Sequence, residues 1–303
     1  MQWAAETHVT EELAGRLVAE QFPPLPERSV TLLSEGWDYA VHLVDEAWTF
    51  RFPRREVVVA GTERELSVLP QLGRLLPVPV PIPVHVGRPG ELFPWLFYGS
   101  RFLSGVEAGD AALGDDERVR LARPLARALR SLHSAESLAA VGGVLPFDPI
   151  GRADMAVRVP RTRDALEAVA ALGLWTPPPA VGELLERAFV LPPAEPASVC
   201  HGDLHFRQLL VDRAELAGIV DWVDVCRSDP GVDLQLLWSF LPPAGRDEFL
   251  DEYGPVSAGS LLRARVLALF LNAILARYGR VEGMHAVEVE ALAALARTVA
   301  DLS

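Results

Sequence analysis

The stretch HGDLHFRQLLV, residues 201–211, and the stretch GIVDWVD, residues 218–224, carry the strongest signal in this chain. Asp203 stands near the start of the first stretch, and an amide, Gln208, follows five residues later. Asp221 comes eighteen residues after Asp203 and ends the apolar run AGIV. Short apolar runs bounded by turn residues are typical of strands. We therefore expect two short strands that present an aspartate, an amide and a second aspartate from adjacent ends.

This order of side chains suits phosphoryl transfer. One carboxylate can face an acceptor hydroxyl, while a second carboxylate and a side-chain oxygen hold Mg²⁺ against a triphosphate. An isolated aspartate before a strand is usually a turn residue, but the coupling of Asp203 to Gln208 and Asp221 favours catalysis. The alternative is a metal site on His201 and His205, and the sequence near them offers no further cluster of ligands to complete it.

The composition narrows the class of protein. Half of the 303 residues are hydrophobic, so a sizeable core can form as one large domain or two small ones. The net charge of −13 argues against nucleic acid as a partner and is compatible with a cationic ligand. All 28 basic residues are arginine, which excludes a Walker A lysine and a lysine Schiff base.

Cysteine usage and the N-terminal sequence predict a cytoplasmic protein. The two cysteines, Cys200 and Cys226, are too few for a disulfide framework. The opening MQWAAETHVTEEL lacks the basic and apolar regions of a signal peptide. The longest apolar run, residues 266–276, is too short to span a bilayer and predicts a core helix, so no membrane association is expected.

Hydrophobic periodicity predicts an α+β fold with a β-rich region over residues 1–100 and a larger, mostly helical region over 101–303. Turns are expected at 34–38 and 45–47, and an edge strand within the proline-rich stretch 77–87. One expected helix, 62–75, has Thr62 as its N-cap, Glu65 three residues later, and Pro70 as a residue that shortens it. The other expected helices cover residues 10–20, 115–134, 163–174, 180–189 and most of 232–303.

These motifs resemble those of the aminoglycoside phosphotransferase family, small-molecule kinases that share the protein-kinase-like fold. HGDLH is similar to the family's catalytic loop, and GIVDW to its metal-binding segment. LSEGWDYAVHLV and WTFRFPRR resemble the nucleotide loop and the following strand of the branch that includes aminoglycoside 2″- and macrolide 2′-phosphotransferases. The resemblance covers nearly the whole chain and implies a bilobal, protein-kinase-like fold.

The resemblance also implies roles for individual residues. Asp203 would orient the acceptor hydroxyl, while Asp221 and Gln208 would hold Mg²⁺. His201 would position the catalytic loop, and Asp233 would anchor it. The nucleotide, ATP or GTP, would be bound by the loop at 34–38, by an Arg–Glu pair in place of the usual Lys–Glu pair, and by a hinge. The residues for these tasks are Ser34, Gly36, Arg51, Glu65, Phe97, Tyr98 and Ser100.

The acceptor is expected to be the hydroxyl of a small, cationic molecule, most favourably an aminoglycoside or related amino sugar, with antibiotic resistance as the consequence. Macrolides, amino alcohols and housekeeping metabolites stay open as alternatives. Asp224 and Trp238 are candidate acceptor residues, and the acidic stretch DEFLDE at 247–252 is a further source of negative charge. A monomer or a homodimer is expected.

Two departures from the family pattern leave a catalytically weak, ligand-binding homologue as a second hypothesis. Asparagine is usual where Gln208 stands, with histidine in the two branches named, and lysine is usual where Arg51 stands. A protein kinase is a third hypothesis, and the sequence disfavours it. Only about a dozen residues separate Asp221 from Asp233, which leaves no room for a long activation segment, and the motifs DFG and APE are absent.

Overall fold

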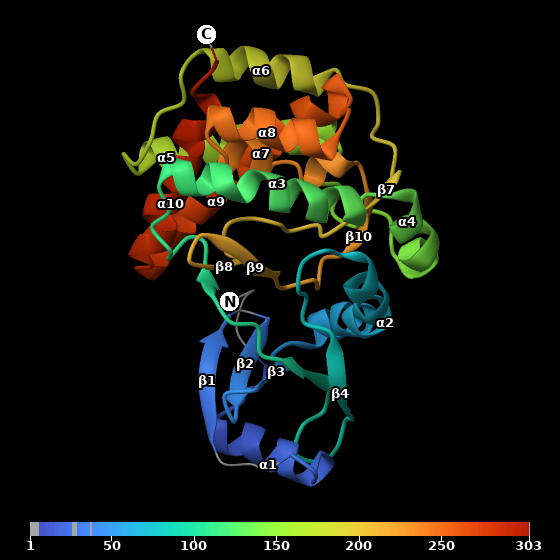
Figure 1. The fold of residues 1–303 in the computed structure, drawn as a ribbon. Helices are drawn as coiled ribbons and strands as arrows, with labels where there is room; N and C mark the ends of the chain where they lie inside the picture. Colours follow the sequence, from blue (N-terminus) through green and yellow to red (C-terminus); the bar gives the residue numbers. More distant parts are fainter. Residues whose placement is uncertain (1–5, 26–28, 37, 303) are drawn as a thin grey trace. The chain divides into compact units, whose positions relative to one another are not determined.

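The computed structural model describes residues 6–25, 29–36 and 38–302. The chain divides into two compact units (Figure 1). The first consists of Met1–Arg74 and Pro79–Ser104, and the second of Leu75–Val78 and Gly105–Ser303.

The first unit is built on a five-stranded antiparallel sheet in the order β1-β2-β3-β5-β4. Helix α1 lies against one face of this sheet (Figure 1), and their shared core contains the rings of Phe50, Phe52 and Phe97. The proline-rich stretch supplies an edge strand, as expected. The elements are α1 (Glu11–Gln21), β1 (Val30–Glu35), β2 (Tyr39–Val44), β3 (Trp48–Pro53), the 3₁₀ turn η1 (Glu56–Val58), α2 (Val59–Leu75), β4 (Pro83–Gly87) and β5 (Phe97–Arg101).

Helix α2 differs from its expected form at Thr62 and at Pro70. It begins at Val59, because the turn η1 leads directly into it, and Thr62 is an interior residue whose Oγ1 donates to the Val58 carbonyl at 3.2 Å. The predicted N-cap is therefore wrong. Pro70 does not shorten the helix, which continues to Leu75. Burial of Leu69 and Leu72 on either side of the proline offsets the lost backbone hydrogen bond.

The second unit is mostly helical, as expected, with two small sheets of order β10-β7 and β6-β8-β9. Its strands are β6 (Val106–Glu107), β7 (Ser198–Cys200), β8 (Leu209–Asp212), β9 (Glu215–Ile219) and β10 (Cys226–Ser228). Its helices are α3 (Asp115–Leu132), α4 (Ala135–Val141), α5 (Met155–Ala171), α6 (Ala180–Phe189), α7 (Leu236–Ser239), α8 (Pro243–Tyr253), α9 (Ala258–Glu282) and α10 (His285–Val299), with 3₁₀ turns η2 (Gly142–Val144) and η3 (Pro230–Val232).

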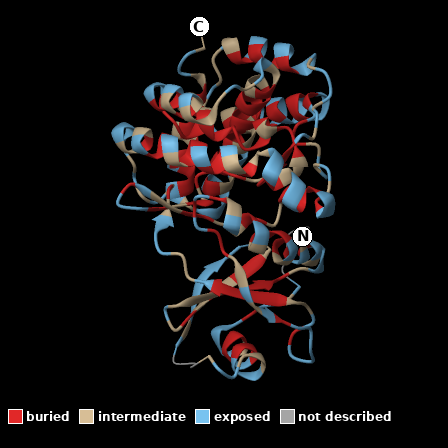
Figure 2. Cartoon of the chain, turned by 45° about the vertical axis from the view of Figure 1, so that its right-hand side comes forward, coloured by how far each residue is buried: buried red, intermediate tan, exposed pale blue. Residues whose placement is uncertain are grey.

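The core of the second unit forms where α5, α6 and α10 pack on α9. In Figure 2 the buried positions of the helical unit gather on the sides of its helices that face one another. By length and composition alone α9 could cross a membrane, but 61% of its most apolar window is buried inside the protein. A buried core helix passes the same test.

Candidate active site

The catalytic stretch lies between two paired strands. Strand β7 ends at Cys200, which pairs directly with Cys226 at the start of β10, and the hairpin β8–β9 lies between them in sequence. The chain turns at Gly202 with φ +94°, and a Cβ there would approach the Asp224 carbonyl oxygen to 2.3 Å. Only glycine allows this contact. The loop that carries Asp203 is thereby held against the loop that carries Asp221 and Asp224.

The Asp233 carboxylate anchors the loop that carries Asp203. Its Oδ2 accepts the backbone N–H of His201 at 2.7 Å, and its Oδ1 accepts that of Gly202 at 3.1 Å. His133 at the end of α3 places Nε2 3.0 Å from Oδ2. Burial alone would raise the pKa of Asp233, but the hydrogen bond and charge of His133 lower it overall, so the carboxylate is ionised.

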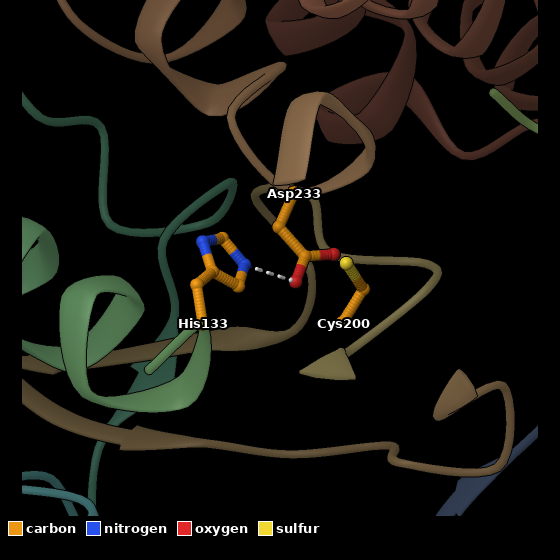
Figure 3. A group of neighbouring side chains, drawn as sticks. All are labelled: His133, Cys200 and Asp233. Carbon is orange, nitrogen blue, oxygen red and sulfur yellow. Dashed lines mark hydrogen bonds and ion pairs between the residues drawn. The ribbon is translucent and has the colours of Figure 1, made fainter. Parts of the chain in front are cut away.

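Among the described residues, His133, Cys200 and Asp233 gather closely enough to suggest a metal site, with ligand atoms within 4.8 Å of one another (Figure 3). The chemistry argues against one. Both oxygens of Asp233 already accept hydrogen bonds, and burial raises the pKa of the Cys200 thiol well above its usual value, which keeps it protonated. The cluster therefore serves to support the loop.

His201 links the two aspartate loops. Its Nε2 donates to the Val220 carbonyl at 3.0 Å, directly before Asp221, and its Nδ1 faces the backbone N–H of Asp203 at 3.4 Å. The ring packs on Trp222 at 4.7 Å between centroids. Burial lowers the pKa of His201, so the ring is neutral and this arrangement of donor and acceptor persists at physiological pH.

Several charged side chains act on the carboxyl group of Asp203 and change its pKa. Burial, with the nearby charge of Asp224, raises the pKa of its carboxyl to about 8, although Arg152 opposes the shift. The side chain is still 41% exposed. A carboxylate with a raised pKa is a stronger proton acceptor than an ordinary aspartate, which suits a residue that takes a hydrogen bond from a hydroxyl.

His205 touches Asp203 and was not assigned to the site from the sequence. Its Nδ1 faces the Arg207 N–H at 3.3 Å, which leaves the proton on Nε2, and Nε2 lies 3.8 Å from Asp203 Oδ2. Burial lowers the pKa of His205 to about 3, so the ring stays neutral. His205 is placed to orient the Asp203 carboxylate.

Gln208 and Asp221 fit the expected Mg²⁺ site in their chemistry. Gln208 is 7% exposed, and its Oε1 is buried without a hydrogen-bond partner among the residues that the structure describes. A buried amide oxygen without a donor is costly unless a cation or a metal-bound water satisfies it. Asp221 adopts φ +65°, a left-handed conformation that aspartate tolerates better than most residues.

Arg152 is the main site residue that sequence reasoning missed. It binds Asp148 at 3.2 Å and forms a shorter ion pair with Asp224. A lone arginine in the loop before α5 gives no local signal of these partners. Asp224 was expected to contact a cationic acceptor, and in this structure Arg152 occupies it.

The acidic stretch 247–252 is likewise neutralised in part. Glu248 pairs with Arg123 of α3 at 3.1 Å, and Glu252 lies 3.1 Å from Arg130 and 3.3 Å from Arg127. Their role toward an acceptor stays a prediction, and in this structure both carboxylates bind arginines of α3. Trp238 lies beneath the guanidinium groups of Arg246 and Arg265, at 4.9 and 4.3 Å, and its role toward the acceptor stays a prediction.

The first unit holds the residues expected at the nucleotide. Arg51 and Glu65 form an ion pair at 3.9 Å, and the Arg51 guanidinium lies 4.2 Å over the ring of Tyr39. In the loop at 34–38, the Gly36 N–H donates to the Tyr39 carbonyl at 2.9 Å, and Arg54 donates to the Gly36 carbonyl. Ser34 is exposed on β1, and Trp37 lies outside the described residues.

The pairing of β5, the expected hinge strand, with β3 shows which side chains lie on each face of β5. Tyr98 pairs with Arg51 and Ser100 with Thr49, so they share the face that carries Arg51. Phe97 points the other way and packs on Phe52 with no exposed surface. The Phe97 side chain is therefore a core residue and not a contact for the base, because side chains alternate along a strand.

The raised pKa of Asp203 predicts a stability cost. Between about pH 4 and pH 8, the folded protein holds a proton that the unfolded chain has released. The free energy of unfolding therefore falls as pH rises through this window. Because the side chain is partly exposed, we expect ligand-free Asp203→Asn to gain only about 1 kcal/mol, or about 2 °C in Tm, at about pH 8.5 and little at about pH 4. Thermal unfolding at both pH values tests this, and a variant no more stable at the higher pH contradicts it.

Solved structures of known proteins share this fold. The chain shares 24% identity and a TM-score of 0.68 with APH(2″)-IIIa in complex with GDP and kanamycin, over 95% of this chain and 98% of that one. With ADP-bound aminoglycoside phosphotransferase APH(2″)-Ib the chain shares 18% identity and a TM-score of 0.56, over 96% of this chain and 99% of that one. With the apoenzyme of macrolide 2′-phosphotransferase MphH from Brachybacterium faecium it shares 23% identity and a TM-score of 0.60, over 94% of this chain and 98% of that one. At these identities the likeness establishes the fold, which is the expected kinase-like α+β fold.

No curated protein sequence matches the chain. A model of the phosphotransferase enzyme family matches residues 29–269, most of the chain and all of the catalytic segment. The resemblance drawn from HGDLH and GIVDW is therefore confirmed, and the chain belongs to the phosphotransferase enzyme family.

Proposed function

We propose that this phosphotransferase moves the terminal phosphate of ATP or GTP to a hydroxyl group of a small molecule. The observation that carries the proposal is that the loop of Asp203 and the loop of Asp221 are held together by direct contacts. Gly202 packs on the Asp224 backbone, and His201 joins the Asp203 N–H to the carbonyl before Asp221. A catalytic carboxylate and a metal-binding carboxylate held together in this way are what phosphoryl transfer requires.

The chain's own residues account for acceptor activation. The acceptor oxygen forms a bond to the terminal phosphorus while the bond from that phosphorus to the bridging oxygen of the leaving diphosphate breaks. The proton of the acceptor hydroxyl passes to the Asp203 carboxylate in its ionised form, whose fraction rises as the pH approaches and passes about 8. His205 keeps that carboxylate oriented, since its neutral ring presents Nε2 toward Oδ2. Positioning and charge stabilisation supply most of the rate in such reactions.

Mg²⁺ and the nucleotide complete the proposal. Asp221 and Gln208 would hold the ion, which when bound neutralises the charge of the triphosphate. Arg51, buried beside Glu65 and Tyr39, would bind a phosphate group. Structures of the related enzymes contain GDP in one case and ADP in another, so both bases enter the test.

The charges of the second unit favour an acceptor that is not strongly cationic. Asp224 is paired with Arg152, and Glu248 and Glu252 are paired with arginines of α3. An aminoglycoside would need free carboxylates at its amino groups. Kanamycin and a macrolide, the compound and the compound class that the related structures name, are therefore tested as alternatives to an uncharged or anionic alcohol.

The function is tested by nucleotide turnover with a panel of alcohols that spans cationic, neutral and anionic acceptors. ADP or GDP release should depend on the acceptor, and a phosphorylated alcohol should appear by mass spectrometry. Asp203→Asn should reduce kcat by about 10²–10⁴-fold because it removes the orienting carboxylate. Nucleotide binding, measured by calorimetry, should survive in the variant. Acceptor-dependent turnover that is equal in wild type and variant removes Asp203 from the mechanism.

His205 is expected to act on kcat through Asp203. His205→Phe keeps the ring volume but loses Nε2–H, and we expect a fall in kcat of about tenfold with an unchanged nucleotide KM. His205→Gln, whose amide can restore a donor, should recover part of the loss. The two variants together separate orientation from packing. Equal activity in all three proteins shows that His205 does not orient Asp203.

The two metal ligands are expected to differ in importance. Asp221→Asn preserves a residue that tolerates the left-handed backbone but removes the charge, so turnover should be lost at any practical Mg²⁺ concentration. Gln208→Ala should only raise the Mg²⁺ concentration needed for half-maximal rate, because the longer stem of glutamine makes it a weaker ligand. A Mg²⁺ titration of both variants decides the ranking. If the Gln208→Ala protein is folded and as inactive as Asp221→Asn, Gln208 is a primary ligand.

A further inference from the structure

Arg158, in the first turns of α5, is a buried cation without a counter-ion among the described residues. The residue is 2% exposed, and both Nε and Nη2 are buried without a hydrogen-bond partner in the part of the chain that the structure describes. The guanidinium lies 4.4 Å over the ring of Phe270 on α9. The ring supports one face of the group and cannot satisfy Nε and Nη2, whose N–H bonds lie in the guanidinium plane.

The charges around Arg158 increase this imbalance. Its charged neighbours include two further arginines, Arg161 and Arg152. The carboxylate that acts on it, Asp148, already binds Arg152 at 3.2 Å and the Ala153 N–H at 3.0 Å. Burial and the two arginines lower the pKa of Arg158 to about 10, so the group is still protonated at physiological pH.

A buried, unpaired guanidinium destabilises a fold, and an apolar residue of similar size would be more stable in the same place. Natural proteins retain such groups where function uses them, since a ligand of opposite charge can satisfy the donors. Arginine presents its donors as a planar fork that matches a carboxylate or a phosphate with two hydrogen bonds. The ligand chemistry that fits Arg158 is therefore anionic.

We propose that Arg158 binds an anionic group, a carboxylate or a phosphate ester, of the acceptor alcohol. Arg152 connects Arg158 with the reacting residues. Its charge acts on Arg158, and it pairs with Asp224 in the loop that packs on Gly202, which precedes Asp203. The inference rests on the proposed phosphotransfer to an alcohol and names its substrate class. The acceptor is a hydroxylated acid or a phosphorylated alcohol, and not a polycationic aminoglycoside.

The first test is made on the ligand-free protein and needs no turnover. Arg158→Met keeps an unbranched apolar stem over Phe270 and removes the charge, while Arg161→Met, on the exposed surface of the same helix, is the matched control. We expect Arg158→Met to raise Tm by about 2 °C or more, because the uncompensated charge is gone, and Arg161→Met to change it little. A loss of several degrees in Arg158→Met shows that the arginine is a structural residue and overturns the proposal.

The second test adds anions. Sodium sulfate or inorganic phosphate, compared with sodium chloride at equal ionic strength, should raise Tm in the wild type and in Arg161→Met. The increase should be smaller in Arg158→Met, because general salt effects act on all three proteins and only the site is removed. The same increase in all three proteins shows that Arg158 binds no anion.

Kinetics separate failure of this inference from failure of the proposed function. Glucuronate, glucuronamide and glucosamine offer one sugar frame with an anionic, a neutral or a cationic group, and glucose 6-phosphate supplies the phosphate ester. We expect turnover of an anionic member, with kcat/KM at least about tenfold lower in Arg158→Met and the loss mainly in KM. Turnover confined to glucosamine or kanamycin supports the function and overturns the inference. If no alcohol is turned over, the proposed function fails, and the anion-dependent stability still decides the site.

Discussion

The candidate active site depends on one buried carboxylate. Asp233 accepts two successive backbone N–H groups of the catalytic loop and lies within hydrogen-bond distance of the imidazole of His133. A loop that turns through the left-handed glycine Gly202 cannot satisfy these donors with regular secondary structure, and buried donors without partners are costly. The carboxylate removes that cost and fixes the backbone before Asp203. The hydrogen bond from His133 keeps Asp233 ionised, so the end of α3 supports the geometry of the catalytic loop.

The elements that sequence reasoning predicted are those encoded by local patterns. The leucines of α3 recur at helical spacing and all lie in the core, and the strands around the turn at 45–47 follow period-two alternation. Asp203, Gln208 and Asp221 lie around the hairpin β8–β9, as the expected pair of short strands requires, and their roles stay predictions. The start of α2 was missed because a 3₁₀ turn precedes it, and a capping-box pattern inside the helix gave a false boundary.

The features that could not be predicted are long-range pairings of charge and the faces of short strands. Arg152 and Asp224 are far apart in sequence, as are Glu252 and its arginines on α3, and nothing local to either partner identifies the other. Phe97 and Tyr98 are both bulky hinge residues, and only the register of β5 with β3 shows that one lies in the core and the other beside Arg51. Residue identity alone therefore did not separate the buried Phe97 side chain from Tyr98, or paired carboxylates from free ones.

Net charge is a poor guide to the ligand of this protein for the same reason. A charge of −13 acts on approaching molecules over distances that salt reduces to about 8 Å, so it influences encounter more than recognition. In the proposed acceptor site, recognition would be decided by which charged groups are unpaired. Arg152 is compensated by Asp148 and Asp224, whereas Arg158 is surrounded by like charges and lies on an aromatic ring. On this proposal, an acidic protein presents a locally cationic acceptor site, because the carboxylates nearby are already paired with Arg152.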